Sequence, residues 1–175
     1  MNYFQLFGLE PTFSLDLKAL SATYQQLQKA VHPDRFASAS EQEQLLAVQK
    51  SSTINDAYQI LKNPLKRGEY ILELRGAKLP SEQSTLGDTS FLMRQMELRE
   101  MLAEVKEADD IDAAVFEATQ VLETEFEQHF KAMQVALAEH SDDGNKSASD
   151  HLRKLKFYQK LHAELDRLEE LLFDD

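Results

Sequence analysis

Residues 17–34 read LKALSATYQQLQKAVHPD and set the architecture of the N-terminal half of the chain. Apolar side chains recur in this segment at spacings of three and four, which places them on one buried face of an α-helix: Leu17, Leu20, Tyr24, Leu27 and Val31. We expect Ser14 to cap the start of this helix. Pro33 ends it, because proline disfavours helical geometry in the residue before it. A polar loop is predicted from Arg35 to Ala39.

Further helices are predicted on both sides of this segment. Residues Tyr3 to Phe7 form a short helix that Gly8 closes, since glycine tolerates the left-handed conformation found after a helix end. Downstream, Ser40 and Glu43 form a capping-box pattern that opens a longer helix. Its buried face is expected to comprise Ala47, Ser51, Ile54, Tyr58 and Leu61.

The pair Asn63-Pro64 marks the end of that helix and the start of a fourth one. Asn63 is the expected cap, and Pro64 occupies the first helical position. The fourth helix ends at Gly76 and carries Arg67, Tyr70, Ile71 and Leu74. Residues 77–88 contain a proline, a glycine and two serines, and they are predicted to form a linker.

Three longer helical patterns follow, at about residues 89–107, 110–140 and 148–173. Residues 141–145 (SDDGN) are predicted to form a turn, with Ser147 and Asp150 as a cap for the last helix. Long helices with short connections pack antiparallel, so residues 89–175 predict a three-helix bundle. The expected fold is all-α, with a helical hairpin and short flanking helices in residues 1–76, because Leu and Ala abound and favour helix.

The charge of the chain is uneven. Residues 1–76 contain eight Lys or Arg and eight Asp or Glu, whereas residues 77–175 contain 11 and 23 and account for the entire net charge of −12. An acidic surface repels phosphate backbones, so nucleic acid is a poor candidate partner. The step in charge also indicates two modules.

The chain contains no cysteine. It therefore cannot form disulfides or supply thiolates to a zinc or iron–sulfur site, and we expect no bound metal and no cofactor. The first residues lack the basic start and long apolar stretch of a signal peptide, and no apolar run approaches the ~20 residues that a membrane span needs. The expected location is the cytoplasm.

The tripeptide His32-Pro33-Asp34 gains meaning from the residues that follow it. Residues 54–61 (INDAYQIL) lead into Asn63-Pro64 and then into residues 66–70 (KRGEY). This series, with the order of the helices, resembles the J domain, the module with which co-chaperones stimulate ATP hydrolysis by seventy-kilodalton heat-shock chaperones. The resemblance covers about residues 1–76. It implies two long antiparallel helices that display the tripeptide at their connecting turn.

By this resemblance, the tripeptide binds the chaperone. Its proline fixes the backbone at low entropic cost, so His32 and Asp34 are presented pre-organised, and Asp34 is expected to pair with a basic group. The outer face of the preceding helix is expected to steer the encounter; it comprises Lys18, Ala22, Gln25 and Lys29. The alternative interpretation is a helix stop with a solvated imidazole and carboxylate, beside ordinary solvated lysines.

The helix predicted at residues 89–107 has two distinct faces. One is a core stripe of Phe91, Gln95, Leu98, Leu102 and Val105. Roughly opposite lie Leu92, Met93, Met96, Glu97, Glu100 and Glu104. A surface helix needs only one apolar face, and exposed Leu and Met side chains grouped together indicate a contact site. The alternative is that this second face packs against the N-terminal module.

Residues 88–100 (DTSFLMRQMELRE) and 153–157 (RKLKF) resemble one subfamily of J proteins, the HscB type. That subfamily delivers the iron–sulfur scaffold protein IscU to the specialised chaperone HscA and stimulates its ATPase during iron–sulfur cluster assembly and transfer. The absence of a Gly/Phe-rich linker and of zinc-binding Cys pairs separates the chain from general-purpose J proteins. The resemblance implies that the scaffold docks on the second face of helix 89–107, which Phe157 either completes or merely supports from the core.

Other function classes are weaker candidates. His32 and Asp34 have no accompanying nucleophile or glycine-rich phosphate loop, so an enzyme is not expected. His129 lies on the apolar stripe of helix 110–140 and is expected to be a satisfied core histidine rather than a ligand. A general J-domain adaptor whose bundle binds a different client, or dimerises, remains the main alternative. An acidic mimic of nucleic acid is disfavoured by the neutral N-terminal half.

Overall fold

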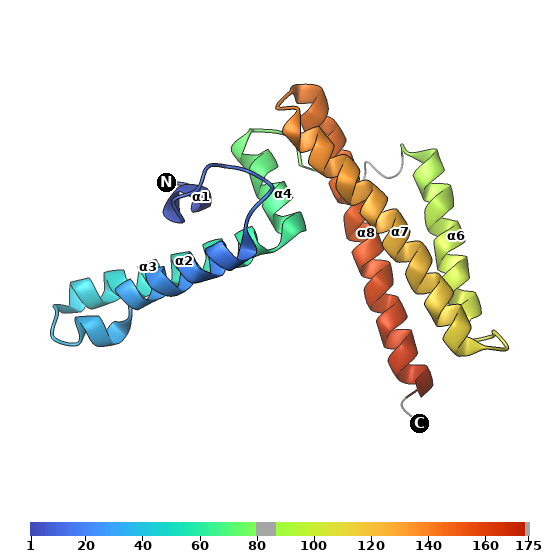
Figure 1. Cartoon of the computed structure of the whole chain (residues 1–175), viewed down its shortest axis with the longest axis horizontal. Helices are drawn as coiled ribbons and strands as arrows, with labels where there is room; N and C mark the ends of the chain where they lie inside the picture. Colours follow the sequence, from blue (N-terminus) through green and yellow to red (C-terminus); the bar gives the residue numbers. More distant parts are fainter. Residues whose placement is uncertain (80–86, 174–175) are drawn as a thin grey trace. The chain divides into compact units, whose positions relative to one another are not determined.

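The computed structural model describes residues 1–79 and 87–173, and within them every regular element is helical. The chain divides into two compact units, Met1–Arg75 and Gly76–Asp175. Unit 1 contains α1 (Tyr3–Leu6), α2 (Leu17–Ala30), the 3₁₀ helix η1 (Pro33–Phe36), α3 (Glu41–Lys62) and α4 (Pro64–Leu74). Unit 2 contains α6 (Thr89–Val105), α7 (Ile111–Ala138) and α8 (Asp142–Phe173) (Figure 1). The all-α prediction is confirmed.

Part of the predicted linker, residues 80–86, lies outside the described residues. Across residues 1–79 and 87–173, no helix combines the length and the apolar character that crossing a membrane requires.

In unit 1, α2 and α3 form an antiparallel hairpin joined by η1 (Figure 1). Near its middle the two helices are held by an aromatic and a polar pair. The rings of Tyr24 and Tyr58 stack with centroids 4.2 Å apart, and the Ser51 hydroxyl donates to Gln28 Oε1 at 2.7 Å. The prediction of a buried face on α3 is confirmed for its aliphatic residues, because Ala47, Ile54 and Leu61 are buried.

Three details of unit 1 differ from the prediction. Asp16, not Ser14, caps α2, because its carboxylate accepts hydrogen bonds from the backbone N–H groups of Lys18 and Ala19. Leu17 then becomes the first residue of the helix, at the edge of the apolar stripe, and its side chain is 49% exposed. The residues after Val31 do not enter an irregular loop directly, since η1 begins at Pro33.

The fourth helix begins as predicted. Asn63 Oδ1 accepts from the backbone N–H groups of Leu65 and Lys66, each at 3.1 Å, and Pro64 is the first helical residue. Arg67 on this helix is a core residue.

The Arg67 side chain is 5% exposed and lies over the ring of Phe13. Its Nε donates to the carbonyl of Phe13 at 2.8 Å, and its second guanidinium nitrogen donates to the carbonyl of Leu61 at 2.6 Å. Burial lowers the pKa of this guanidinium. Arg67 therefore ties the segment before α2 to the end of α3.

In unit 2, α7 and α8 form a long antiparallel pair, and α6 packs against α7 (Figure 1). All three helices contribute to one core, whose buried members are Phe91, Leu98, Leu102, Val105, Val115, Ala118, Leu122, Tyr158, Leu161 and Leu165. The apolar positions predicted for the core stripe of helix 89–107 are all in this set.

The turn predicted at residues 141–145 is wrong, as is the cap at Ser147. The chain reverses at His140, which has φ 50°, and α8 begins at Asp142. Ser141 caps it, because its hydroxyl accepts from the N–H of Gly144 at 3.0 Å. A Cβ on Gly144 would lie 2.6 Å from the carbonyl oxygen of Ala136 on α7. This glycine therefore allows two helices to approach closely and does not form a turn.

Candidate partner-binding sites

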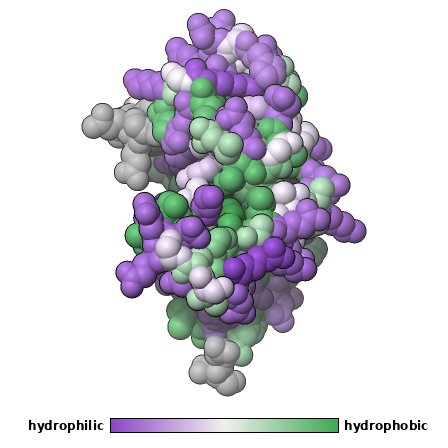
Figure 2. Space-filling view, turned by 90° about the vertical axis from the view of Figure 1, so that its left-hand side faces the viewer, coloured by the Kyte–Doolittle hydropathy of each residue, from purple (hydrophilic) through white to green (hydrophobic). Residues whose placement is uncertain are grey.

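The tripeptide His32-Pro33-Asp34 lies on the surface between α2 and α3. The side chains of His32 and Asp34 are 59% and 92% exposed. Figure 2 views the molecule from the side on which this hairpin end lies, and hydrophilic and hydrophobic side chains are intermixed on that face. His32 is the N-cap of η1: its Nδ1 accepts from the backbone N–H of Asp34 at 3.2 Å. A neutral His32 in this bond carries its proton on Nε2. The turn thus presents an imidazole donor and a carboxylate side by side, with His32 Nδ1 3.5 Å from Asp34 Oδ2.

Gln44 on α3 holds the rest of this connection, and sequence reasoning missed it. Its side-chain amide Nε2 lies 3.0 Å from the carbonyl oxygen of Phe36 and 3.4 Å from those of Ala37 and Ala39. The Phe36 carbonyl also accepts from the backbone N–H of Ala39 at 3.0 Å, so Gln44 adds a further bond there. A glutamine four residues after the cap Ser40 gives no pattern from which this contact could be predicted.

The outer face of α2 is exposed as predicted. Lys18, Gln25 and Lys29 are all solvent-exposed, whereas Leu20 on the opposite face is buried. With Lys29 in the last turn of α2, this face brings positive charge close to the tripeptide.

The second face of α6 is also exposed. We call it the α6 patch: Leu92, Met93, Met96, Glu97, Glu100 and Glu104. Met93 is 59% and Met96 71% exposed, the three glutamates are exposed, and Leu92 is half-buried. Exposed methionines offer an adaptable apolar surface, and the carboxylates along the same helix favour a partner with basic groups.

Two arginines that sequence reasoning missed border the α6 patch. Arg94 binds both carboxylate oxygens of Glu125 on α7, at 2.7 and 2.8 Å, and also Glu97 at 2.7 Å. These bonds raise the pKa of Arg94. Arg99 lies over the ring of Phe157, 5.6 Å from its centroid, and pairs with Glu164 at 3.2 Å. Glu97 is thus held in place, and both arginines at this border are paired with carboxylates.

Phe157 lies at the edge of the core of unit 2. Its side chain is half-buried and packs edge-on against the core residue Phe91, with ring centroids 5.5 Å apart. It therefore supports the core, and its part in a binding surface stays a prediction.

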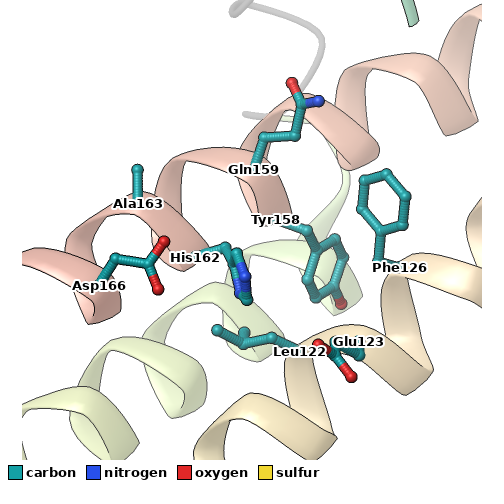
Figure 3. Close-up of a pocket in the computed structure, with 8 residues that line it drawn as sticks. All are labelled: Leu122, Glu123, Phe126, Tyr158, Gln159, His162, Ala163 and Asp166. Atoms are coloured by element: carbon teal, nitrogen blue, oxygen red, sulfur yellow. The ribbon is translucent and has the colours of Figure 1, made fainter. Parts of the chain in front are cut away.

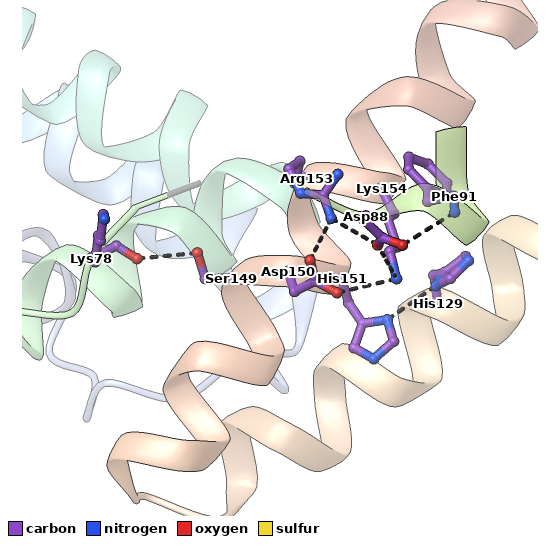
Figure 4. A network of polar contacts seen from close by, with 9 residues as sticks. All are labelled: Lys78, Asp88, Phe91, His129, Ser149, Asp150, His151, Arg153 and Lys154. Atoms are coloured by element: carbon purple, nitrogen blue, oxygen red, sulfur yellow. Dashed lines mark hydrogen bonds and ion pairs between the residues drawn. The ribbon is translucent and has the colours of Figure 1, made fainter. Parts of the chain in front are cut away.

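The start of α6 is held by a network of charges (Figure 4). Asp88 caps α6, accepting from the N–H of Phe91 at 3.1 Å, and it also pairs with Arg153 at 3.3 Å and Lys154 at 3.4 Å. The bond from Phe91 and the two cations lower the pKa of Asp88. Asp150 pairs with the same two cations. The network holds the first turn of α6, where the α6 patch begins.

His129 is satisfied, as expected, but by a partner that the sequence did not indicate. Its Nδ1 lies 3.0 Å from Nδ1 of His151 on α8. Both rings are half-buried, and burial lowers the pKa of each. Among residues 1–79 and 87–173, no cluster of three or more His, Cys, Asp or Glu is arranged to hold a metal ion.

Comparison with known proteins agrees with both units. A family model described as the DnaJ domain matches residues 2–70, and one described as the HscB C-terminal oligomerisation domain matches residues 87–166. A protein of Colwellia psychrerythraea named co-chaperone protein HscB homolog is 60% identical over 175 residues and is matched along its whole length. A protein of the same name from Aeromonas hydrophila is 49% identical over 174 residues, which cover 99% of each chain.

Solved structures agree as well. The chaperone HscB from Vibrio cholerae matches 98% of this chain and 100% of its own, with a TM-score of 0.92 and 45% identity. The human co-chaperone protein HscB matches 97% of this chain and 82% of its own, with a TM-score of 0.86 and 30% identity. The chain therefore belongs to the HscB family of J-domain co-chaperones.

Proposed function

We propose that this protein carries an iron–sulfur scaffold protein of the IscU type to a specialised chaperone of the HscA type and stimulates the ATPase of that chaperone during iron–sulfur cluster assembly and transfer. The observation that carries the proposal is the exposure of His32 and Asp34 on a capped, proline-containing turn in a chain of this family. The cytoplasm is the proposed location.

Unit 1 provides the surface for the chaperone. His32, Pro33 and Asp34 make the directional contacts, because a carboxylate on a fixed turn can pair with an arginine at little entropic cost. Lys18, Gln25 and Lys29 on α2 provide a weakly basic approach surface for an acidic partner. The chain binds and positions the chaperone, and the ATPase chemistry belongs to the chaperone.

Unit 2 provides the surface for the scaffold. Met93 and Met96 are exposed apolar anchors, and Glu100 and Glu104 follow them along α6. A few buried anchors supply most of the energy of an interface, while rim charges mainly set selectivity and encounter rate. A client with an apolar spot inside a basic rim fits this surface, and Phe157 lies at its border.

A general J-domain adaptor for a different client is the second candidate. Exposed methionines favour it in one respect, because such side chains adapt to varied partners. The two candidates share unit 1 and differ only in what the α6 patch binds, so a test with the scaffold separates them.

An ATPase assay tests the proposal. An HscA-type chaperone is mixed with this protein, with an IscU-type scaffold, or with both, and steady-state hydrolysis is measured. We expect a moderate increase with this protein alone and a larger one with both, because the scaffold is presented to the chaperone. An increase that is the same with and without the scaffold supports the general adaptor, and no increase at all rejects the J-domain function.

A further inference from the structure

The α7–α8 pair carries a groove that the proposed function does not use. It encloses about 560 Å³, and all the residues that line it come from α7 and α8. Its apolar lining comprises Leu122, Phe126, Tyr158 and Ala163, and the carboxylates of Glu123 and Asp166 also line it (Figure 3). The groove is therefore an apolar seam with a carboxylate on each helix.

The groove lies on a different side of α7 from α6. Glu125 on α7 faces α6, since it binds Arg94 there. Phe126, the next residue, is turned by about 100° around the helix axis and lines the groove instead. A binding event in the groove can thus be distinguished from one on the α6 patch.

One exposed aromatic side chain extends the groove along each helix. Phe116 lies two turns before Glu123 on α7, and Phe173 lies two turns after Asp166 on α8, so each shares a helix face with the groove. Their side chains are 65% and 48% exposed. From Phe116 to Phe126 the seam is about 15 Å long, which corresponds to about ten residues of a docked helix.

The charges at the groove select its occupant. Its lining contains two carboxylates and neither a lysine nor an arginine. Residues 77–175 as a whole contain 23 acidic and 11 basic residues, so a second copy of this chain brings negative charge to a negative rim. A partner segment with apolar anchors and flanking Lys or Arg matches both the floor and the rim.

We propose that the α7–α8 groove is a second docking surface, which binds a basic amphipathic helix of a partner protein. Such a helix lays its apolar face on the seam, as amphipathic helices do in apolar grooves elsewhere, and completes a four-helix arrangement with α6, α7 and α8. Its lysines or arginines pair with Glu123 and Asp166. This inference goes beyond the proposed function and does not depend on it.

A synthetic peptide probe tests the groove directly. The probe is an amphipathic helix of about 14 residues built from Leu and Lys, with one Trp on its apolar face. The protein contains no tryptophan, so fluorescence changes report the environment of the probe alone. We expect the full-length protein to bind it at about 0.15 M salt, where loose surface attraction is largely screened, and a Leu/Glu version not to bind.

Matched variants locate the binding. The double substitution Glu123→Lys with Asp166→Lys is expected to weaken binding at least about tenfold. Glu107→Lys with Glu117→Lys makes the same change in net charge at exposed positions outside the groove lining and is expected to change binding less than about twofold.

Three results would overturn the inference. Equal weakening by the two charge reversals would mean that the probe responds only to net charge. Weakening by Met93→Ala with Met96→Ala, and not by the groove variant, would place the probe on the α6 patch. Concentration-dependent dimers in sedimentation, abolished by the groove substitutions, would make a second copy the occupant. The scaffold and ATPase assays are separate readouts, so the proposed function can fail while the groove is confirmed.

Discussion

The Nδ1 atoms of His129 and His151 lie 3.0 Å apart, one on α7 and the other on α8. At this distance one ring must donate its Nδ1 proton and the other must accept it, so the pair cannot carry protons on both Nδ1 atoms without repulsion. The positive charge of Lys154 on α8 also lowers the pKa of His129, whereas the carboxylates of Glu125 and Asp150 raise it. The rings of Phe91 on α6 and Tyr158 on α8 pack against the His129 ring.

Acidification should therefore destabilise unit 2 in two separate steps. Both histidines have a pKa below their ordinary value of 6.5 in the folded protein. The unfolded chain then binds more protons, so the free energy of unfolding falls as the pH drops from about 6.5 toward the lowered values. The carboxyls of Asp88 and Asp150 also have a lowered pKa, so their contribution is lost only at pH values below about 3.8.

Urea unfolding at a series of pH values between 5 and 7.5 measures the first step. Replacing both members of the pair, His129→Gln with His151→Gln, should flatten this pH dependence. The variant His162→Gln removes one imidazole elsewhere on α8 and is the matched control. An unchanged slope in the double variant would show that the histidine pair does not contribute.

Asp34→Asn should remove most of the chaperone stimulation without unfolding unit 1. The side chain is 92% exposed, and the carboxylate is proposed to form a charged hydrogen bond with the chaperone, worth about 1.5–3 kcal/mol or roughly 10–100-fold in affinity. Chaperone ATPase rates measured over a range of co-chaperone concentrations provide the test. Asp56→Asn, at an exposed position on α3, is the control, and full stimulation by Asp34→Asn would contradict the assigned role.

Truncating the apolar part of the α6 patch should weaken binding of the scaffold. Leu92→Ala, Met93→Ala and Met96→Ala together are expected to cost several kcal/mol, about 1–2 for each true anchor. Isothermal titration calorimetry with the scaffold measures the loss. Val135→Ala removes an exposed apolar side chain from α7 and should have no effect. Equal affinities for the triple variant and the unaltered protein would move the docking site away from α6.

Arg67→Met should destabilise unit 1 by about 2–4 kcal/mol, because the buried carbonyls of Phe13 and Leu61 both lose a charged donor. Thermal or urea unfolding followed by circular dichroism gives the size of the effect. Lys66→Met, at the exposed position next to it, is the control. A loss of well under 1 kcal/mol would mean that water replaces the guanidinium and that the bonds matter little.

Gly144→Ala should destabilise unit 2 even though alanine favours helix over glycine. The propensity gain is about 1 kcal/mol, but the new Cβ meets the backbone carbonyl of Ala136 at 2.6 Å and forces α7 and α8 apart. Overpacking of this kind costs about 1–3 kcal/mol. The Gly144→Ala variant is therefore expected to have a lower urea or thermal unfolding midpoint. A raised midpoint would show that α7 and α8 can move apart at this contact with little loss of stability.

Much of the secondary structure follows from the chain read alone, because a cap or an apolar stripe involves residues one or two turns apart. Ser40, Asn63 and Pro64 act where the pattern places them, and the apolar positions of the stripe in helix 89–107 are buried. The same local logic finds the exposed tripeptide and the exposed methionines, since a helix end and a second apolar face are visible within one segment.

The remaining features depend on residues far apart in sequence. Arg67 reaches Phe13, Arg99 lies over Phe157, His129 meets His151, and Gly144 admits a neighbouring helix. Each contact requires a particular axial and rotational register between two helices. That register is set by the packing of a whole core, and no pattern within a single helix encodes it. Periodicity therefore identifies which face of each helix is buried, and only the packed structure determines what that face touches.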